Sequence, residues 1–85
     1  MAISWDPLKS EWLKRTRGVS FEEILRAKQV AIEEHPKRPN QKLLLFALNG
    51  YIWSVPYVTN GDDVFLKTAY PSRMYTKKWL RGELK

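Results

Sequence analysis

Two apolar runs joined by a tight turn decide the fold of this chain: Leu43-Leu-Leu-Phe-Ala-Leu48, then Asn49-Gly50, then Tyr51-Ile-Trp-Ser-Val-Pro-Tyr-Val58. β-Branched and aromatic residues favour strands, and Asn-Gly between such runs is the strongest short signal for a β-hairpin. A second Asn-Gly at residues 60–61 precedes a third run over residues 64–69. The sequence therefore predicts a three-stranded antiparallel meander.

The two turns also predict which side chains share a face of this sheet. The expected facing pairs are Leu48–Tyr51, Phe46–Trp53, Leu44–Val55, Thr59–Asp62, Val55–Leu66 and Trp53–Thr68. One face then carries Leu44, Phe46, Trp53, Val55, Val64 and Leu66. The other face carries Leu43, Leu45, Ile52, Phe65 and Ala69, with Ser54 beside Lys67.

Outward from the meander, the N-terminal half predicts two helices. Asp6-Pro7 is a helix start and Gly18 a helix end, with Leu8 and Trp12 on one apolar face. Ser20 to Glu23 forms a capping box, and the spacing of the following apolar residues predicts a second helix running to about residue 34. A proline-containing loop over residues 35–40 then leads into the strands.

The C-terminal part predicts one more short helix, capped by Ser72 and carrying Met74, Tyr75, Trp79 and Leu80. The predicted fold class is α+β. Two N-terminal helices pack on an antiparallel three- to four-stranded sheet, and a short C-terminal helix follows. Eighty-five residues are enough for one small domain over residues 1–85.

Composition narrows the class of protein. The net charge of +6 favours an acidic partner, and the absence of cysteine excludes a disulfide framework and a thiolate site. The N-terminus lacks the pattern of a signal peptide and no apolar run is long enough to cross a membrane, so we expect a cytoplasmic protein with no membrane partner. His35 is the only histidine, and we expect neither a metal site nor a cofactor.

The last nineteen residues suggest the chemistry. From Lys67 onward there are six Lys/Arg against one acid, Glu83, with aromatic rings at positions 70, 75 and 79. Cations bind phosphates and aromatic faces stack on unpaired bases, so this segment suits a single-stranded or distorted polynucleotide. Metal-free cleavage of RNA also needs cations around the phosphorane and groups that move protons. The candidate catalytic residues are Lys67, Tyr70, Arg73 and Tyr75, and the candidate RNA-steering residues are Lys77, Lys78 and Arg81.

Two motifs resemble one protein family. Trp5-Asp6 opening the first helix and Gly18-Val-Ser-Phe-Glu-Glu23 opening the second are similar to the start of BrnT-type toxins, within the RelE-like group of bacterial ribonuclease toxins. In that family the last strand runs into a segment like Ser-Ala-Arg-Lys-Ala-Thr before a basic helix. Here Pro71-Ser-Arg-Met-Tyr-Thr76 takes that place. The resemblance covers nearly the whole chain in order of elements, on few matching residues.

The chain also departs from the family pattern. Arg17 stands where histidine is common, Trp79 stands where a charge is usual, and only Lys67 or Thr68 lies near the usual strand arginine. The resemblance implies a RelE-like fold and a toxin that cleaves RNA, including ribosome-associated mRNA. It also implies a co-encoded antitoxin that neutralises the toxin, with operator DNA bound only through the antitoxin complex. The alternatives are a non-catalytic nucleic-acid-binding module and a structural subunit that only binds an antitoxin-like partner.

Overall fold

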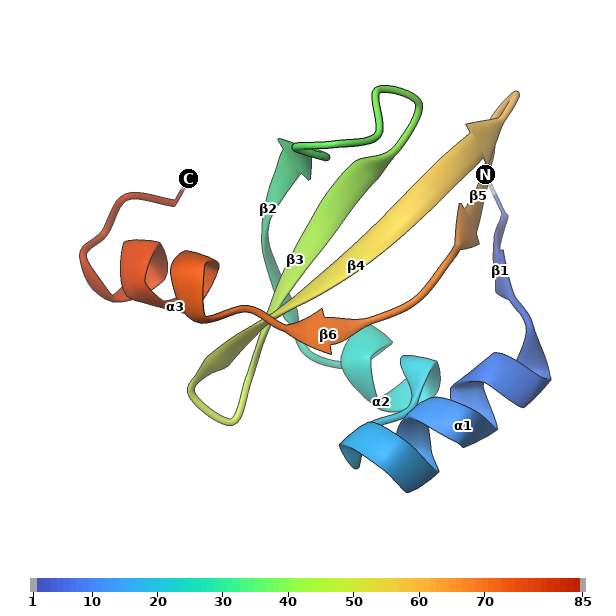
Figure 1. The fold of residues 1–85 in the computed structure, drawn as a ribbon, viewed down its shortest axis with the longest axis horizontal. Coiled ribbons are helices and arrows are strands. Elements are labelled where there is room, and N and C mark those ends of the chain that lie inside the picture. The colour runs from blue at the N-terminus through green and yellow to red at the C-terminus, as the bar shows by residue number, and fades with distance from the viewer. Residues whose placement is uncertain (1, 85) are drawn as a thin grey trace.

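A six-stranded mixed sheet forms the centre of the computed structural model, which describes residues 2–84 (Figure 1). The elements in chain order are β1 (Ile3–Trp5), α1 (Pro7–Arg17), α2 (Phe21–Leu25), β2 (Lys28–Glu34), β3 (Lys42–Leu48), β4 (Tyr51–Asn60), β5 (Asp63–Leu66), β6 (Tyr70–Pro71) and α3 (Arg73–Leu80). The strand order is β1-β5-β4-β3-β2, and β6 also pairs with β4. β1 runs parallel to β5, and the other neighbours are antiparallel. The predicted α+β class is confirmed.

The first hairpin has the predicted register. Leu48 pairs with Tyr51, and the pairs Phe46–Trp53 and Leu44–Val55 follow from it. Both turn residues are left-handed, with φ of 54° at Asn49 and 78° at Gly50. Left-handed residues at both centre positions match the right-handed twist of the strands, which is why Asn-Gly fits here.

The predicted register of the second hairpin is wrong by two residues. Asn60 pairs with Asp63 and Tyr57 with Leu66, so the turn is Gly61-Asp62. A shift of two residues keeps every side chain on its face, so Val64 and Leu66 still lie where the alternation predicts. β5 ends at Leu66, and Ala69 lies on the opposite face from the predicted one. Ser54 consequently pairs with Tyr70 of β6 and not with Lys67.

The predicted order of helices before sheet is wrong in two places. A strand, β1, precedes the first helix, and the second helix stops at Leu25. Residues 28–34 form the edge strand β2, which pairs with β3 and carries a bulge between Gln29 and Ala31. The β-branched residues Val30 and Ile32 favour a strand once β3 offers a partner, and this tertiary pairing overrides the helical spacing.

The helix caps agree with the sequence. Asp6 accepts from the N–H of Leu8, Ser20 and Glu23 form the predicted capping box, and Ser72 caps α3. The predicted apolar face of α1 is wrong, because Leu8 is 72% exposed and Leu13 is fully buried. No helix within residues 2–84 combines the length and the apolar character that crossing a membrane requires.

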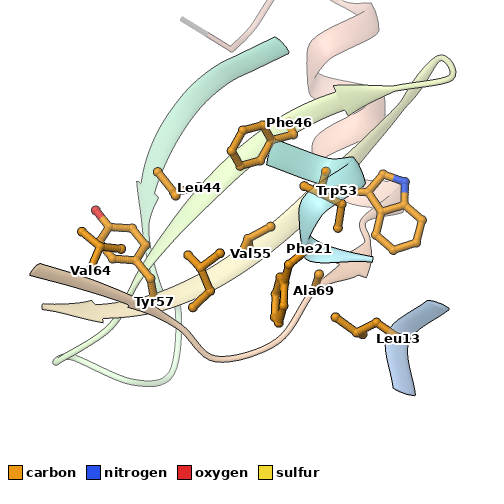
Figure 2. Close-up of a cluster of buried hydrophobic side chains, with 11 residues drawn as sticks. Leu13, Phe21, Leu44, Phe46, Trp53, Val55, Tyr57, Val64 and Ala69 are labelled. Carbon is orange, nitrogen blue, oxygen red and sulfur yellow. The ribbon is translucent and has the colours of Figure 1, made fainter. Parts of the chain in front are cut away.

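The sheet separates two clusters of buried side chains. On the face covered by α1 and α2 lie Leu13, Phe21, Ile24, Leu44, Phe46, Trp53, Val55, Tyr57, Val64, Leu66 and Ala69 (Figure 2). On the face covered by α3 lie Ala31, Leu43, Leu45, Ile52 and Tyr75. Alternate residues of β3 and β4 supply both clusters, so these central strands are buried on both sides.

Candidate functional site

A pocket of about 320 Å³ lies where the loop between β2 and β3 meets the chain leaving β5. Its lining residues are His35, Arg38, Gln41, Pro56, Lys67, Thr68 and Tyr70. Its volume is at the lower end of the range of roughly 300–1,000 Å³ for small-molecule sites. It is therefore large enough for part of one nucleotide.

Hydrogen bonds within the loop fix one wall of the pocket. The backbone N–H of His35 donates to the carbonyl of Gln41 at 3.3 Å, and the N–H of Gln41 donates to the carbonyl of Arg38 at 3.1 Å. The His35 ring nitrogen Nδ1 accepts from the backbone N–H groups of Lys37, at 3.0 Å, and Arg38, at 3.1 Å. Because β2 and β3 pair directly at Glu34 and Lys42, the loop is closed at its base as well.

The opposite wall is the segment between β5 and β6. The N–H of Lys67 donates to the carbonyl of Pro56 at 2.8 Å, which continues the pairing with β4. Arg17 donates to the carbonyl of Ala69, and Tyr70 pairs with Ser54 in the sheet. The segment is thus held at three successive points although it has no regular structure over residues 67–69.

The charged side chains that line the pocket are positive. Arg38 and Lys67 supply two cations, and Thr68 and Tyr70 supply hydroxyl groups. None of the described residues that line the pocket carries a carboxylate. The Lys67 ammonium also lies 5.7 Å from the ring centroid of Phe65, whose side chain is 38% exposed. Cations and donors with an exposed ring beside them suit an anionic ligand that has an aromatic part.

The structure brings together two of the four predicted catalytic residues, Lys67 and Tyr70. Arg73 is exposed at the first residue of α3 and does not line the pocket. Tyr75 is only 8% exposed and belongs to the cluster beneath α3. Burial raises the pKa of Tyr75, and the charges of Glu33 and Tyr70 raise it further. This is the opposite direction from the lowered pKa on which a proton-transfer role for Tyr75 depends.

The predicted RNA-steering residues lie on α3 and at its C-cap, Arg81. Lys77 is exposed, the Lys78 ammonium lies 5.8 Å from the ring centroid of Tyr75, and Arg81 forms an ion pair with Glu83 at 3.1 Å. Thr76 fixes this helix to the sheet, because its hydroxyl accepts from the N–H of Ile52 at 2.8 Å. The helix therefore displays its cations from a rigid base.

Sequence reasoning missed His35, Arg38, Gln41 and Thr68 as pocket residues. The sequence predicts His35 as the first residue of a loop that follows a long second helix, and such a helix would have carried the loop away from the sheet. The signal that could have found it is the β-branched pair Val30 and Ile32. A strand there makes residues 35–41 a hairpin loop at the end of the sheet where β5 finishes.

Within residues 2–84, no three His, Asp or Glu side chains gather into a group that could hold a metal ion. No protein-family model, curated protein or solved structure matches this chain. The resemblance to BrnT-type toxins therefore stays a prediction, and the pocket between the 35–41 loop and residues 67–70 is interpreted from its own geometry.

Proposed function

We propose that this chain is a metal-independent endoribonuclease that acts as the toxin of a toxin–antitoxin pair. The observation that carries the proposal is the pocket that gathers Arg38, Lys67 and Tyr70 with an imidazole and without a carboxylate. Cleavage of RNA develops negative charge on phosphate oxygens, and preorganised cations in a small site stabilise such charge strongly.

The reaction needs only the RNA, the pocket and water. The 2′-oxygen forms a bond to phosphorus while the bond from phosphorus to the 5′-oxygen breaks. The proton of the 2′-hydroxyl passes to water, and the 5′-oxygen takes a proton from Tyr70 or from water. The products are a 2′,3′-cyclic phosphate and a free 5′-hydroxyl. Lys67 and Arg38 hold the phosphate oxygens. Tyr70 orients the nucleotide or donates a proton to the 5′-oxygen and recovers one from water.

The surroundings of the pocket suit an extended strand of RNA. The exposed ring of Phe65 lies beside Lys67 and offers a stacking face for a base. Arg73, Lys77 and Lys78 on α3 add cations that attract the phosphate backbone, and Arg81, paired with Glu83, follows at the C-cap of the helix. The net charge of +6 supports the same partner.

The remaining parts of the proposal rest on the resemblance to BrnT-type toxins. They are a RelE-like fold, action in the cytoplasm on mRNA that includes ribosome-bound mRNA, and neutralisation by a co-encoded antitoxin. Operator DNA is contacted only through the antitoxin complex. An acidic antitoxin segment would complement the basic surface of this chain.

The test is expression of the chain in a bacterial host, followed by growth, total-RNA integrity and primer extension. We expect growth arrest with discrete cuts in RNA. Lys67→Ala tests whether cleavage takes place in the pocket. Arg73→Ala tests whether it takes place on the surface of α3 instead. Arg15→Ala removes an exposed cation of α1 outside the pocket and is the matched control for charge.

Cleavage that is lost in Lys67→Ala and kept in Arg15→Ala supports the pocket as the site. Cleavage that survives Lys67→Ala and is lost in Arg73→Ala moves the site to α3. Intact RNA and normal growth with soluble, folded wild-type protein would contradict the enzyme. Salt-dependent RNA binding in that case would favour the non-catalytic binding module.

A further inference from the structure

The two nitrogens of the His35 ring have different surroundings. Nδ1 accepts hydrogen bonds from the backbone N–H groups of Lys37 and Arg38, at 3.0 and 3.1 Å. An imidazole nitrogen that accepts carries no proton, so the proton of the neutral ring lies on Nε2. The loop that forms the pocket wall thereby selects the tautomer.

We infer that His35 is a fixed hydrogen-bond donor to a phosphate group in the pocket and takes no part in proton transfer. Because Nδ1 faces the backbone of its own loop, Nε2–H is the polar edge of the ring left for a ligand. His35 lines the pocket together with Arg38 and Lys67. This assignment deepens the proposed function by naming the group that His35 recognises, and it rests on that function only for the identity of the substrate as RNA.

The tautomer of the ring does not suit an acid–base role. A general base needs an Nε2 without a proton, whereas here Nε2 carries the proton of the neutral ring. If the neutral ring released its Nε2 proton, it would become an imidazolate anion unless Nδ1 gained a proton. A proton on Nδ1 would point at two N–H donors and would break both hydrogen bonds that the loop backbone donates to the ring. A donor that keeps its proton still stabilises negative charge on a phosphate oxygen, as other preorganised donors do.

The neighbours of His35 favour phosphate over other anions. Arg38 comes from the same hydrogen-bonded loop, and its planar guanidinium matches two oxygens of one phosphate. Lys67 and the hydroxyl groups of Thr68 and Tyr70 come from the opposite wall. A tetrahedral anion between the two walls can accept from several of these donors at once, whereas a planar carboxylate offers only two oxygens.

The first experiment is NMR of the isotope-labelled full-length protein, in which His35 is the only histidine and its ring signals need no assignment against others. In the neutral ring we expect an unprotonated Nδ1 and a protonated Nε2. Titration with inorganic phosphate should shift the Nε2 signal, while Nδ1 should stay unprotonated. A ring protonated at Nδ1, or an Nε2 signal that phosphate does not move, would overturn the inference.

Two substitutions distinguish the role of Nε2–H as a donor to phosphate from the role of Nδ1 as the acceptor of the two backbone hydrogen bonds in the loop. In His35→Asn the side-chain oxygen can still accept from the two backbone N–H groups, but no donor reaches the Nε2 position. We expect this variant to fold normally and to bind phosphate about tenfold more weakly, the effect of losing one hydrogen bond to a charged group. His35→Gln restores a donor near Nε2 and should recover part of the binding. Equal phosphate affinity in wild type and His35→Asn would contradict the donor role.

A short single-stranded oligoribonucleotide is titrated in parallel. If it moves the same Nε2 signal and is cleaved, the inference and the proposed function hold together. If inorganic phosphate binds and the RNA neither binds nor is cleaved, the phosphate site stands and the ribonuclease proposal fails. If the RNA is cleaved by a protein whose ring carries its proton on Nδ1, the proposed function stands and the role of His35 fails.

Discussion

Arg17, in the last turn of α1, donates a hydrogen bond from its guanidinium group to the carbonyl oxygen of Ala69, 52 positions further along the chain. The same guanidinium lies 5.0 Å from the ring centroid of Trp12. Ala69 is flanked by Thr68 and Tyr70, which both line the pocket. α1 therefore supports the back of the segment that forms one wall of the candidate site.

This contact predicts a linked loss of stability and function. Arg17→Met keeps the aliphatic stem and removes the donor, so we expect the free energy of unfolding to fall by about 1 kcal/mol, as for one partly exposed hydrogen bond. Phosphate binding and RNA cleavage should fall as well, because Thr68 and Tyr70 are held less firmly. Urea unfolding measures the first effect. Arg15→Met, two residues earlier on α1, is the control and should change stability by less than about 0.5 kcal/mol. Equal effects of the two substitutions would contradict the bracing role.

Two buried serines differ in their hydrogen bonding, so we expect alanine substitutions at them to have different effects on the free energy of unfolding. The Ser10 hydroxyl donates to Glu22 at 2.5 Å and accepts from the N–H of Phe21 at 3.0 Å. The Ser54 hydroxyl is fully buried on β4 and has no hydrogen-bond partner among the described residues. Ser10→Ala leaves a buried N–H unpaired and should lower the free energy of unfolding by about 1–3 kcal/mol. Ser54→Ala removes an unpaired hydroxyl and should leave stability unchanged or raise it by up to about 1 kcal/mol. A clear loss in Ser54→Ala, measured by urea unfolding, would show that its hydroxyl has a partner.

The lowered pKa values of two carboxylates in α2 predict how the free energy of unfolding depends on pH. The pKa of Glu22 is lowered from 4.5, chiefly by the hydrogen bond from Ser10. The pKa of Glu23 is lowered from 4.5 by the backbone N–H of Ser20 and then by Lys14. A lowered pKa means that the folded protein holds the proton less tightly than the unfolded chain does. Both groups therefore stabilise the fold above pH 4.5, and this contribution is lost as the pH falls through the folded-state pKa values.

We therefore expect the urea midpoint to fall as the pH drops below 4.5. The fall should be shallower in Ser10→Ala, because the chief cause of the lowered pKa of Glu22 is then gone. Ser54→Ala keeps the Ser10–Glu22 bond and should retain the slope of the wild type. Parallel curves for wild type and Ser10→Ala would contradict the assignment of the pKa shift to Ser10.

Local chemistry made several elements of this fold predictable. The Asp6 cap, the Ser20–Glu23 capping box and the Asn49-Gly50 turn each depend on a few adjacent residues, and all three are confirmed. Of the candidate site, Lys67 and Tyr70 could be found because cations and aromatic rings are dense after β5. Each of these patterns lies within a short stretch of sequence, so it can be recognised without knowing which distant parts of the chain it contacts.

The parts of the fold and site that were not predicted depend on pairing between strands far apart in the sequence. The spacing of apolar residues does not show such pairing. Residues 28–34 have apolar residues at helical intervals, yet pairing with β3 makes them a strand. β1 has only three residues and owes its conformation to parallel pairing with β5. His35 and Arg38 reach the pocket only because of the strand at residues 28–34, so the error in that element hid the wall that the 35–41 loop forms.

The attachment of α3 to the sheet gives a final prediction. The Thr76 hydroxyl accepts from the buried N–H of Ile52 at 2.8 Å and donates to the carbonyl of Ser72 at 2.6 Å. Thr76→Val keeps the shape of the side chain and leaves the N–H of Ile52 unpaired, so we expect a loss of about 1–3 kcal/mol in the free energy of unfolding. Amide hydrogen exchange should show faster exchange at Ile52 and along α3, with the hairpin turn at Asn49-Gly50 unchanged.

Thr16→Val on α1 is the matched control, because its hydroxyl donates only to the carbonyl of Trp12 on an exposed turn. If Thr76→Val and Thr16→Val cost the same, or if exchange at Ile52 does not change, the hydroxyl of Thr76 does not hold α3 on the sheet.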